Sequence, residues 1–282
     1  MEEIFVETLK IIVFGLVEGF TEWLPISSTG HMILVNELIK LNQPDEYYKV
    51  FEVVIQLGAI LAVVTTFFRQ LWPFARRRSN GRIGLVPSRV DLWIKIIVAC
   101  IPAAVIGILF DDLLDKYLYN GFVVALMLIL YGVFFILIEK RNETVDFHIN
   151  RLQDLDLRTA IYIGLFQCLA LIPGTSRSGA SILGAMLIGV ARTPAAEFSF
   201  FLSVPVMFGA SFLKLIKFGF AFTGPQLFYL ILGMVIAYIV SVYCINFLMR
   251  YIRKNSFAIF GYYRIGLGII VLIWFAISAL LH

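Results

Sequence analysis

Two polar segments interrupt an otherwise apolar sequence, and they hold the residues that could do chemistry. The first runs from Glu18 to His31 and contains two acids, a run of hydroxyl residues and a histidine. The second runs from Gln167 to Gly179 and contains Arg177 among further hydroxyls. Each follows a Gly-Leu pair and places hydroxyls just after a proline. Because ionisable groups are costly to bury in apolar surroundings, both segments are candidates for a functional site.

The two acids of the first segment, Glu18 and Glu22, are four residues apart and therefore share one helical face. Carboxylates this close repel each other, and a divalent cation or an arginine beside them would offset the repulsion. Carboxylate oxygens suit Mg²⁺ or Ca²⁺. Water and substrate phosphate usually complete the coordination of these ions. We therefore expect metal ligands or acid–base groups here. The alternative is that one acid caps a helix and the other faces an aqueous vestibule.

The hydroxyl residues of the first segment follow Pro25, which should end the preceding helix. Ser27, Ser28 and Thr29 are then N-cap candidates for a new helix that continues through His31. A helix N-terminus binds anions through its free N–H groups, so these residues are candidate substrate contacts. Ser28 is also a candidate nucleophile, because His31, three residues later, could accept its proton.

The second segment supplies a cation. Pro173 and Gly174 again break a helix. The hydroxyl residues around Arg177 are candidate caps and substrate contacts: Thr175, Ser176 and Ser178. The planar guanidinium of Arg177 matches phosphate oxygens in a bidentate manner. The alternative is that Arg177 is buried only to pair with Glu18 or Glu22.

Composition places the chain in a membrane. Of its 282 residues, 60% are hydrophobic and only 15% are charged, whereas soluble domains carry more charge. A helix of roughly 20 apolar residues crosses a bilayer, and stretches of this kind lie at 50–70, 92–111, 120–139, 197–217, 226–249 and 260–281. We predict an all-α polytopic membrane protein. The net charge of +4 lies mostly in one loop, so no nucleic-acid partner is expected.

Other polar or sulfur-containing residues within the apolar stretches have simpler explanations. The three cysteines show no metal-binding spacing and are expected to pack as small residues. Interhelix pairs or interface contacts are expected for Glu52, Gln56, Arg192, Glu197 and Arg264.

Lysine and arginine in the short loops predict the orientation of the chain. The Arg-rich loop 73–91 and the stretches 140–158 and 250–254 should be cytoplasmic, and the acidic stretch 111–120 should be outside. The remaining loop, near 217–225, and both termini should then also lie outside.

This path predicts a single integral membrane domain over 1–282, built as an inverted-topology repeat. Half one covers 1–140 and half two covers 155–282, and each half is a re-entrant helical hairpin plus three transmembrane helices. The first hairpin would enter from outside and the second from inside, so the broken helices would meet near the midplane. The alternative is ten ordinary helices with a few polar kinks.

The two segments together indicate a reaction. Paired acids, Arg177, hydroxyl-rich helix starts and His31 converge on a phosphate-like group, and their depth in the bilayer indicates a substrate with a lipid tail. The sequence lacks a Gly-rich nucleotide-binding loop. Hydrolysis of a membrane-embedded phosphate ester or diphosphate is the leading expectation. The rival is a transporter of an anionic lipid or small anion, since broken helices in inverted repeats are a transporter design.

These residues also carry a family resemblance. Glu18-x-x-x-Glu22, the run 24–31 and the run 173–179 resemble the signature regions of bacterial undecaprenyl pyrophosphate phosphatases, the type once named for bacitracin resistance. The resemblance implies dephosphorylation of undecaprenyl diphosphate to the monophosphate at the outer face of the bacterial plasma membrane. That reaction recycles the lipid carrier for peptidoglycan and cell wall biogenesis. It also implies a divalent cation, Mg²⁺ or Ca²⁺, and antibiotic resistance through loss of the target of bacitracin.

The resemblance further implies roles for individual residues. Ser28 would be the nucleophile, His31 the proton acceptor, and Arg177 with Ser176 the diphosphate clamp, while the two acids would be metal or acid–base residues. A water activated by the metal could attack instead, with Ser28 only binding phosphate. A flippase of an anionic polyprenyl phosphate stays the alternative function, and the formation of a homodimer is left open.

Overall fold

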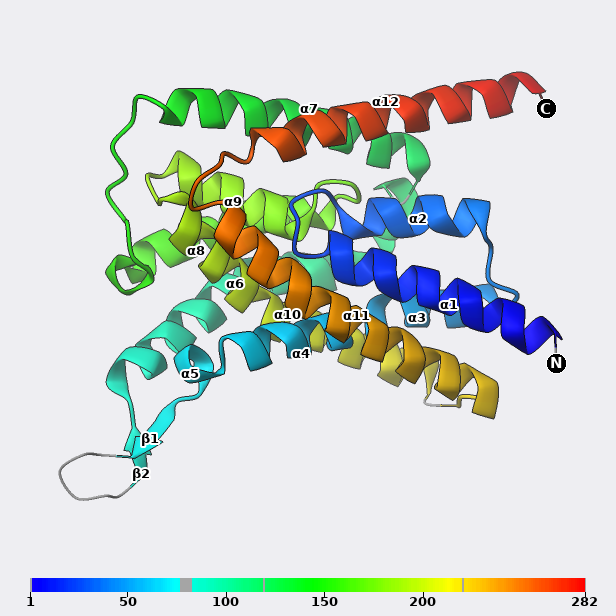
Figure 1. The fold of residues 1–282 in the computed structure, drawn as a ribbon, viewed down its shortest axis with the longest axis horizontal. Helices are drawn as coiled ribbons and strands as arrows, with labels where there is room; N and C mark the ends of the chain where they lie inside the picture. Colours follow the sequence, from blue (N-terminus) through cyan, green and yellow to red (C-terminus); the bar gives the residue numbers. More distant parts are fainter. Residues whose placement is uncertain (1, 77–82, 119, 220, 282) are drawn as a thin grey trace.

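Helices make up nearly all the regular structure of the chain, which the computed structural model describes over residues 2–76, 83–118, 120–219 and 221–281 (Figure 1). Besides the helices, the described residues form one antiparallel hairpin of two three-residue strands. In chain order the elements are α1 Glu2–Thr21, α2 Ser28–Leu38, α3 Asp45–Val54, α4 Gln56–Thr66, α5 Phe68–Leu71, β1 Phe74–Arg76, β2 Ile83–Leu85, α6 Pro87–Leu118, α7 Gly121–Asn142, η1 Leu152–Asp154, α8 Leu157–Gln167, η2 Cys168–Leu171, α9 Arg177–Leu187, α10 Arg192–Phe218, α11 Gly224–Tyr251 and α12 Ala258–Leu281.

Six stretches of the described residues are long and apolar enough to cross a membrane. They are Asp45–Thr66, Pro87–Phe110, Gly121–Asn142, Arg192–Phe218, Gly224–Tyr251 and Ala258–Ile277. Helices of this kind satisfy every backbone hydrogen bond internally, which the bilayer interior requires. The predicted all-α polytopic class and its six apolar spans are confirmed. The α1–α2 and α8–α9 hairpins are not among these six, and their re-entrant insertion stays a prediction.

Three predicted boundaries were wrong. The stretch 111–120, expected as a loop, is helical as far as Leu118, because leucines and a lysine there continue α6 and Asn120 caps the next helix by accepting from Val123 N at 3.0 Å. The first span begins at Asp45 and is interrupted at Ile55, between α3 and α4. The expected loop 73–91 contains the β1–β2 hairpin and the start of α6, and its residues 77–82 lie outside the described residues.

The helices of the two halves are interlocked. Helix α1 packs along α11, helix α8 packs along α6, and α7 and α12 lie side by side (Figure 1). Between α10 and α7, Arg192 Nε donates to Glu139 Oε1 at 2.9 Å, which is one of the expected interhelix pairs. The first hairpin of each half therefore rests on a long helix of the other half.

The two polar segments have matching local structures. Gly15, Ser27 and Gly30 precede Gly164, Ser176 and Gly179 by the same number of residues. Ser27 caps α2 by accepting from Gly30 N at 3.3 Å, and Ser176 caps α9 by accepting from Gly179 N at 3.1 Å. Both caps have positive φ, 72° and 74°, which is rare for residues other than glycine. This match supports the predicted repeat, while the opposite orientation of its halves in a bilayer stays a prediction.

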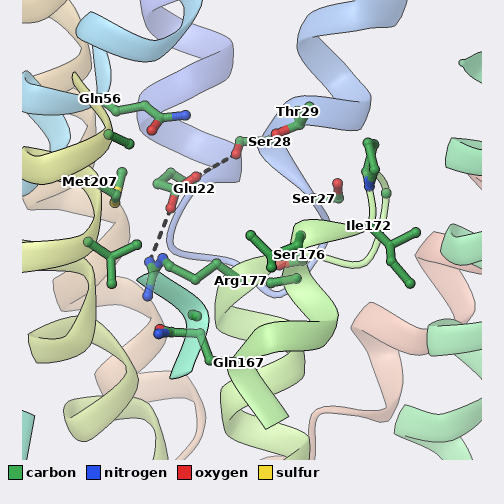
Figure 2. Close-up of a pocket in the computed structure, with 17 residues that line it drawn as sticks. Glu22, Ser27, Ser28, Thr29, Gln56, Gln167, Ile172, Ser176, Arg177 and Met207 are labelled. Carbon is green, nitrogen blue, oxygen red and sulfur yellow. Dashed lines mark hydrogen bonds and ion pairs between the residues drawn. The ribbon is translucent and has the colours of Figure 1, made fainter. Parts of the chain in front are cut away.

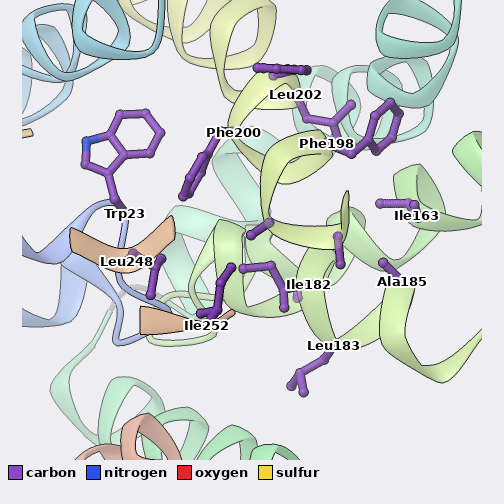
Figure 3. Close-up of a cluster of buried hydrophobic side chains, with 14 of the residues drawn as sticks. Trp23, Ile163, Ile182, Leu183, Ala185, Phe198, Phe200, Leu202, Leu248 and Ile252 are labelled. Carbon is purple, nitrogen blue, oxygen red and sulfur yellow. The ribbon is translucent and has the colours of Figure 1, made fainter. Parts of the chain in front are cut away.

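A buried apolar cluster lies directly behind the loop between α1 and α2. Trp23 is fully buried there and meets Phe200 of α10 edge to face at 5.2 Å (Figure 3). Phe198, Ile182 and Leu248 extend the cluster across α10, α9 and α11. Burying an aromatic ring on the loop fixes the loop against three helices of the second half. The acids of the first polar segment are thereby positioned by apolar packing.

Candidate active site

The first polar segment turns sharply after α1. Glu22 N donates to Glu18 O at 3.0 Å, so the helical turn continues one residue past the end of α1 and places the two acids one turn apart. Beyond Pro25 the chain reverses and Ser27 starts α2. The predicted break at the proline and the predicted cap after it are both confirmed by this geometry.

The second polar segment reverses at Gly174, whose φ of +90° favours glycine. A Cβ at this position would lie 2.5 Å from Val124 O of α7, so no larger side chain fits without movement of the backbone. Thr175 N donates to Ile172 O at 3.2 Å and closes the turn. Ser176 then caps α9, which brings Arg177 to the first position of that helix.

Glu22 joins the two segments. One of its carboxylate oxygens accepts from Ser28 Oγ at 2.5 Å, and the other accepts from Arg177 Nη2 at 3.1 Å (Figure 2). Arg177 Nη1 donates to Ser199 O at 2.7 Å. The Nε of Arg177 is buried and has no hydrogen-bond partner among the residues that the structure describes. A hydroxyl, a carboxylate and a guanidinium with one unused donor therefore form one chain of contacts.

These groups face a cavity of about 190 Å³. It is lined by six of the residues predicted for the site: Glu22, Ser27, Ser28, Thr29, Ser176 and Arg177. Two amide side chains that were not predicted for the site also line it, Gln56 at the start of α4 and Gln167 at the end of α8 (Figure 2). Gln167 occupies the position in its segment that Glu18 occupies in the first, and this correspondence could have identified it.

Glu18 lies beside the cavity rather than in its wall. Its side chain is fully buried, and neither carboxylate oxygen has a hydrogen-bond partner within the described part of the chain. Such oxygens are costly to bury unless a cation or donor completes them. No group of three or more acid, histidine or cysteine side chains is gathered in residues 2–76, 83–118, 120–219 and 221–281. Glu18 and Glu22 therefore fit a cation that draws its remaining ligands from water and substrate.

His31 is bonded away from Ser28. Its Nδ1–H donates to Ser27 O at 2.7 Å, because a carbonyl can only accept. Its Nε2 then accepts from the hydroxyl of Tyr263 on α12, also at 2.7 Å. In the structure the Ser28 hydroxyl therefore has Glu22 as its hydrogen-bond acceptor, and His31 bonds the Ser27 residue that caps α2. Tyr263 was not predicted, since nothing in its local sequence marks it.

Two predicted substrate contacts, Ser178 and Thr175, do not line the cavity. Ser178 Oγ donates to Glu22 O at 3.4 Å and so ties the second segment to the first. Thr175 is fully buried, and its hydroxyl has no partner among the described residues.

Arg264 of α12 supports both loops from behind. Its fully buried guanidinium donates to five backbone carbonyls. The three in the loops are Pro25 O at 3.0 Å, Gly174 O at 2.7 Å and Thr175 O at 2.9 Å. Arg264 was expected to form an interhelix pair or interface contact. The contact consists of hydrogen bonds to backbone carbonyls, which include carbonyls of both polar segments. Arg264 fixes the distance between the loops without entering the cavity.

Comparison with known proteins identifies the family of the chain. The sequence profile of the family described as Bacitracin resistance protein BacA matches residues 11–270. A protein of Enterococcus faecalis named undecaprenyl-diphosphatase is 56% identical over 273 residues, 97% of this chain and 99% of that protein. Proteins of the same name from Desulfitobacterium hafniense and Acetivibrio thermocellus are 57% and 54% identical over 96% and 95% of this chain, and over 97% and 98% of their own lengths. The chain belongs to the bacitracin resistance protein BacA family.

Proposed function

We propose that this protein hydrolyses undecaprenyl diphosphate to undecaprenyl monophosphate and phosphate, the activity for which its relatives are named. The observation that carries the proposal is the bridge through Glu22, which bonds Ser28 of one segment and Arg177 of the other. Phosphoryl transfer requires a positioned nucleophile, a proton acceptor and positive charge beside the phosphate oxygens. The bridge brings these three groups together at a cavity.

The first step is attack by Ser28 Oγ on the terminal phosphorus. The Ser28 proton passes to Glu22, to which the hydroxyl already donates. The bond from phosphorus to the bridging oxygen breaks, and the lipid monophosphate leaves with the electron pair. Water then hydrolyses the phosphoserine: its oxygen bonds to phosphorus as the bond from phosphorus to Ser28 Oγ breaks, and its proton restores the Ser28 hydroxyl. Phosphate leaves, and Glu22 loses the proton that it took from Ser28 to solvent. In this scheme Glu22 takes the role of proton acceptor that the sequence assigned to His31.

Positive potential for the phosphate comes from three sources in the chain. The N-termini of α2 and α9, each 11 residues long, begin at residues that line the cavity. The unused Nε donor of Arg177 is the third. Donors fixed in advance stabilise the charge on the equatorial oxygens at no cost in reorganisation.

A divalent cation fits the acid pair of the site. Glu18, with two buried oxygens that lack donors among the described residues, and Glu22 would hold it. When bound, Mg²⁺ or Ca²⁺ supplies electrostatic stabilisation of phosphate oxygen charge. Two acids lie beside one arginine, so the negative charge of the site exceeds the positive charge. This excess also supports a bound cation.

The proposed site opens toward the outside of the plasma membrane, and both termini lie on that side. Hydrolysis there regenerates the carrier for peptidoglycan and lowers the amount of diphosphate that bacitracin can bind. Transport of a polyprenyl phosphate is the weaker alternative, because a carrier has no need for a serine hydroxyl bonded to a carboxylate.

Phosphate release from undecaprenyl diphosphate by purified protein in detergent tests the function, since no second compartment exists for transport. We expect release by the wild type, loss with a chelator and recovery with Mg²⁺ or Ca²⁺. Ser28→Ala and Glu22→Gln should each reduce turnover by at least about 10³-fold. The matched control is Ser203→Ala, a buried serine whose hydroxyl donates within its own helix. Near-normal release by Ser28→Ala would reject serine attack, and no release by the wild type would reject the function itself.

A further inference from the structure

A second cavity, of about 430 Å³, lies apart from the site described above. It forms where α5, the first turns of α6, the η1 turn and α10 meet. The candidate spans Pro87–Phe110 and Arg192–Phe218 both begin at this level. A cavity at the ends of two spans lies at the depth of the lipid headgroups. None of its lining residues lines the first cavity.

The lining of this second cavity is basic. It includes four cations and two acids: Arg69, Arg89, Lys95, Arg151, Asp91 and Glu197. Asp91 is already paired with Lys95. Arg69 and Arg151 have side chains without a hydrogen bond or ion pair to any residue in the described ranges. Two guanidiniums from separate elements are therefore available to an anion.

Two further features favour an anion that carries phosphate. The 32-residue helix α6 directs its N-terminus at the cavity, with Ser88 of its first turn in the lining. Guanidiniums bind phosphate oxygens as planar forks. Arg89 is held in place because its Nη1 donates to Trp72 O at 2.9 Å.

An exposed aromatic strip borders the same cavity. Phe68, Trp72 and Phe74 are 47%, 50% and 43% exposed. The ring of Trp72 lies 5.4 Å from that of Phe68 and 5.8 Å from that of Phe74. Exposed tryptophan and phenylalanine beside arginines mark the boundary between acyl chains and headgroups. The bond from Arg89 to Trp72 O links the strip directly to the cavity lining.

We infer that the second cavity binds the phosphate-bearing headgroup of an anionic membrane lipid, whose acyl chains lie along the aromatic strip. Basic pockets between transmembrane helices are typical sites for acidic headgroups. Helix α5 and the start of α6, which line the cavity, lie beside the β1–β2 hairpin at the end of the molecule opposite the termini (Figure 1). The predicted topology places that end in the cytoplasmic leaflet.

Native mass spectrometry of the full-length protein in detergent tests this inference. The probes are dioctanoyl phosphatidylglycerol, dioctanoyl phosphatidylcholine and inorganic phosphate, each titrated separately. We expect the wild type to retain phosphatidylglycerol in preference to the other two. Each cation near an anionic lipid contributes about fivefold in affinity, so Arg69→Gln/Arg151→Gln should weaken phosphatidylglycerol binding about thirtyfold.

The matched control is Arg250→Gln/Lys254→Gln, which removes two exposed cations outside the cavity. It should bind phosphatidylglycerol as the wild type does. An equal loss in both double variants would overturn the inference, because nonspecific charge would then explain retention. Unchanged binding in the cavity variant, or equal binding of inorganic phosphate, would also overturn it. Arg151→Lys keeps the charge, so it should retain most of the binding even if the double variant fails to fold.

Discussion

At the scale of residues, Arg264 shows how a buried cation can be stabilised without an acid. The five backbone carbonyls that it contacts supply partial negative charge from several directions. The ring of Tyr131 lies 5.6 Å from the guanidinium and adds a cation–π contact. Since its partners include Pro25 and Gly174, one side chain sets the spacing of both loops of the site.

Replacing this side chain should damage both stability and catalysis. Arg264→Met leaves the Pro25, Gly174 and Thr175 carbonyls without donors, at a cost of about 3 kcal/mol or more in the free energy of unfolding. A loop displaced by about 1 Å should lower kcat about a hundredfold. Thermal unfolding and phosphate release measure the two effects. Arg264→Lys, with three donors, should recover part of each, and wild-type behaviour of Arg264→Met would show that the loops hold their spacing unaided.

Single residues also show what the sequence could and could not predict. The contact between Glu22 and Arg177 was predictable, because burying a charge in apolar surroundings is costly unless an opposite charge pairs with it. The partner of Ser28 was not, because His31 is diverted by Tyr263, 232 positions away in the chain. Local spacing makes His31 available to Ser28, but tertiary packing decides which hydroxyl reaches its ring.

At the scale of elements, close helix contacts hold the broken hairpins in place. At Gly164 in α8, a Cβ would lie 2.1 Å from Ala99 O of α6. At Gly58 in α4, a Cβ would lie 2.0 Å from Met234 O of α11. Helices approach this closely in membranes only where small residues line the contact. The carboxyl end of α8, which carries Gln167 into the cavity, depends on the first of these contacts.

The α8–α6 contact can be tested with a single methyl group. Gly164→Ala should destabilise the protein by about 1–3 kcal/mol, because the two helices must separate. Gly209→Ala in α10 is the control, since no atom lies within 4 Å of its added Cβ. Alanine favours helix over glycine, so the control should be neutral or more stable by up to about 1 kcal/mol. Equal melting temperatures for the two variants would contradict the role given to the close contact.

Element type was predictable and element ends were not. Six apolar stretches are long enough to cross a membrane. A helix satisfies their backbone hydrogen-bonding groups within lipid, so helix could be predicted for each of them. The end of α6 escaped prediction because acidic residues after Phe110 resemble a loop, yet leucines among them continue the helix. The interruption at Ile55 contains no proline that would have marked it in the sequence, and Gly58 N donates to Ile55 O at 3.0 Å across it.

At the scale of the whole molecule, the ends of the helices sort into two groups. The β1–β2 hairpin, the α7–α8 connection and the α11–α12 turn lie at one end, and both termini lie at the other (Figure 1). This sorting agrees with the basic and acidic loops that predicted the topology. Lysine and arginine are in excess at the end that carries the β1–β2 hairpin. This excess predicts that the same end faces the cytoplasm.

Labelling of intact cells can assign the two ends. In a variant with alanine at Cys100, Cys168 and Cys244, a membrane-impermeant maleimide should label Ala221→Cys before permeabilisation. Thr144→Cys should react only afterwards. Both positions are exposed, so accessibility within the protein does not distinguish them. Labelling in the reverse order would invert the topology and place the proposed site on the cytoplasmic side.

The interlocking of the halves has a consequence for biosynthesis. Gly19 O of α1 accepts from Ser241 Oγ of α11 at 3.4 Å, across 222 positions of the chain. A ribosome therefore finishes the acids of the first segment long before it makes the helix on which they rest. Until α11 inserts, α1 lacks the helix with which it makes its most extensive contact. Catalytic competence thus arrives only near the end of translation, and a truncated chain would have the acids without a formed site.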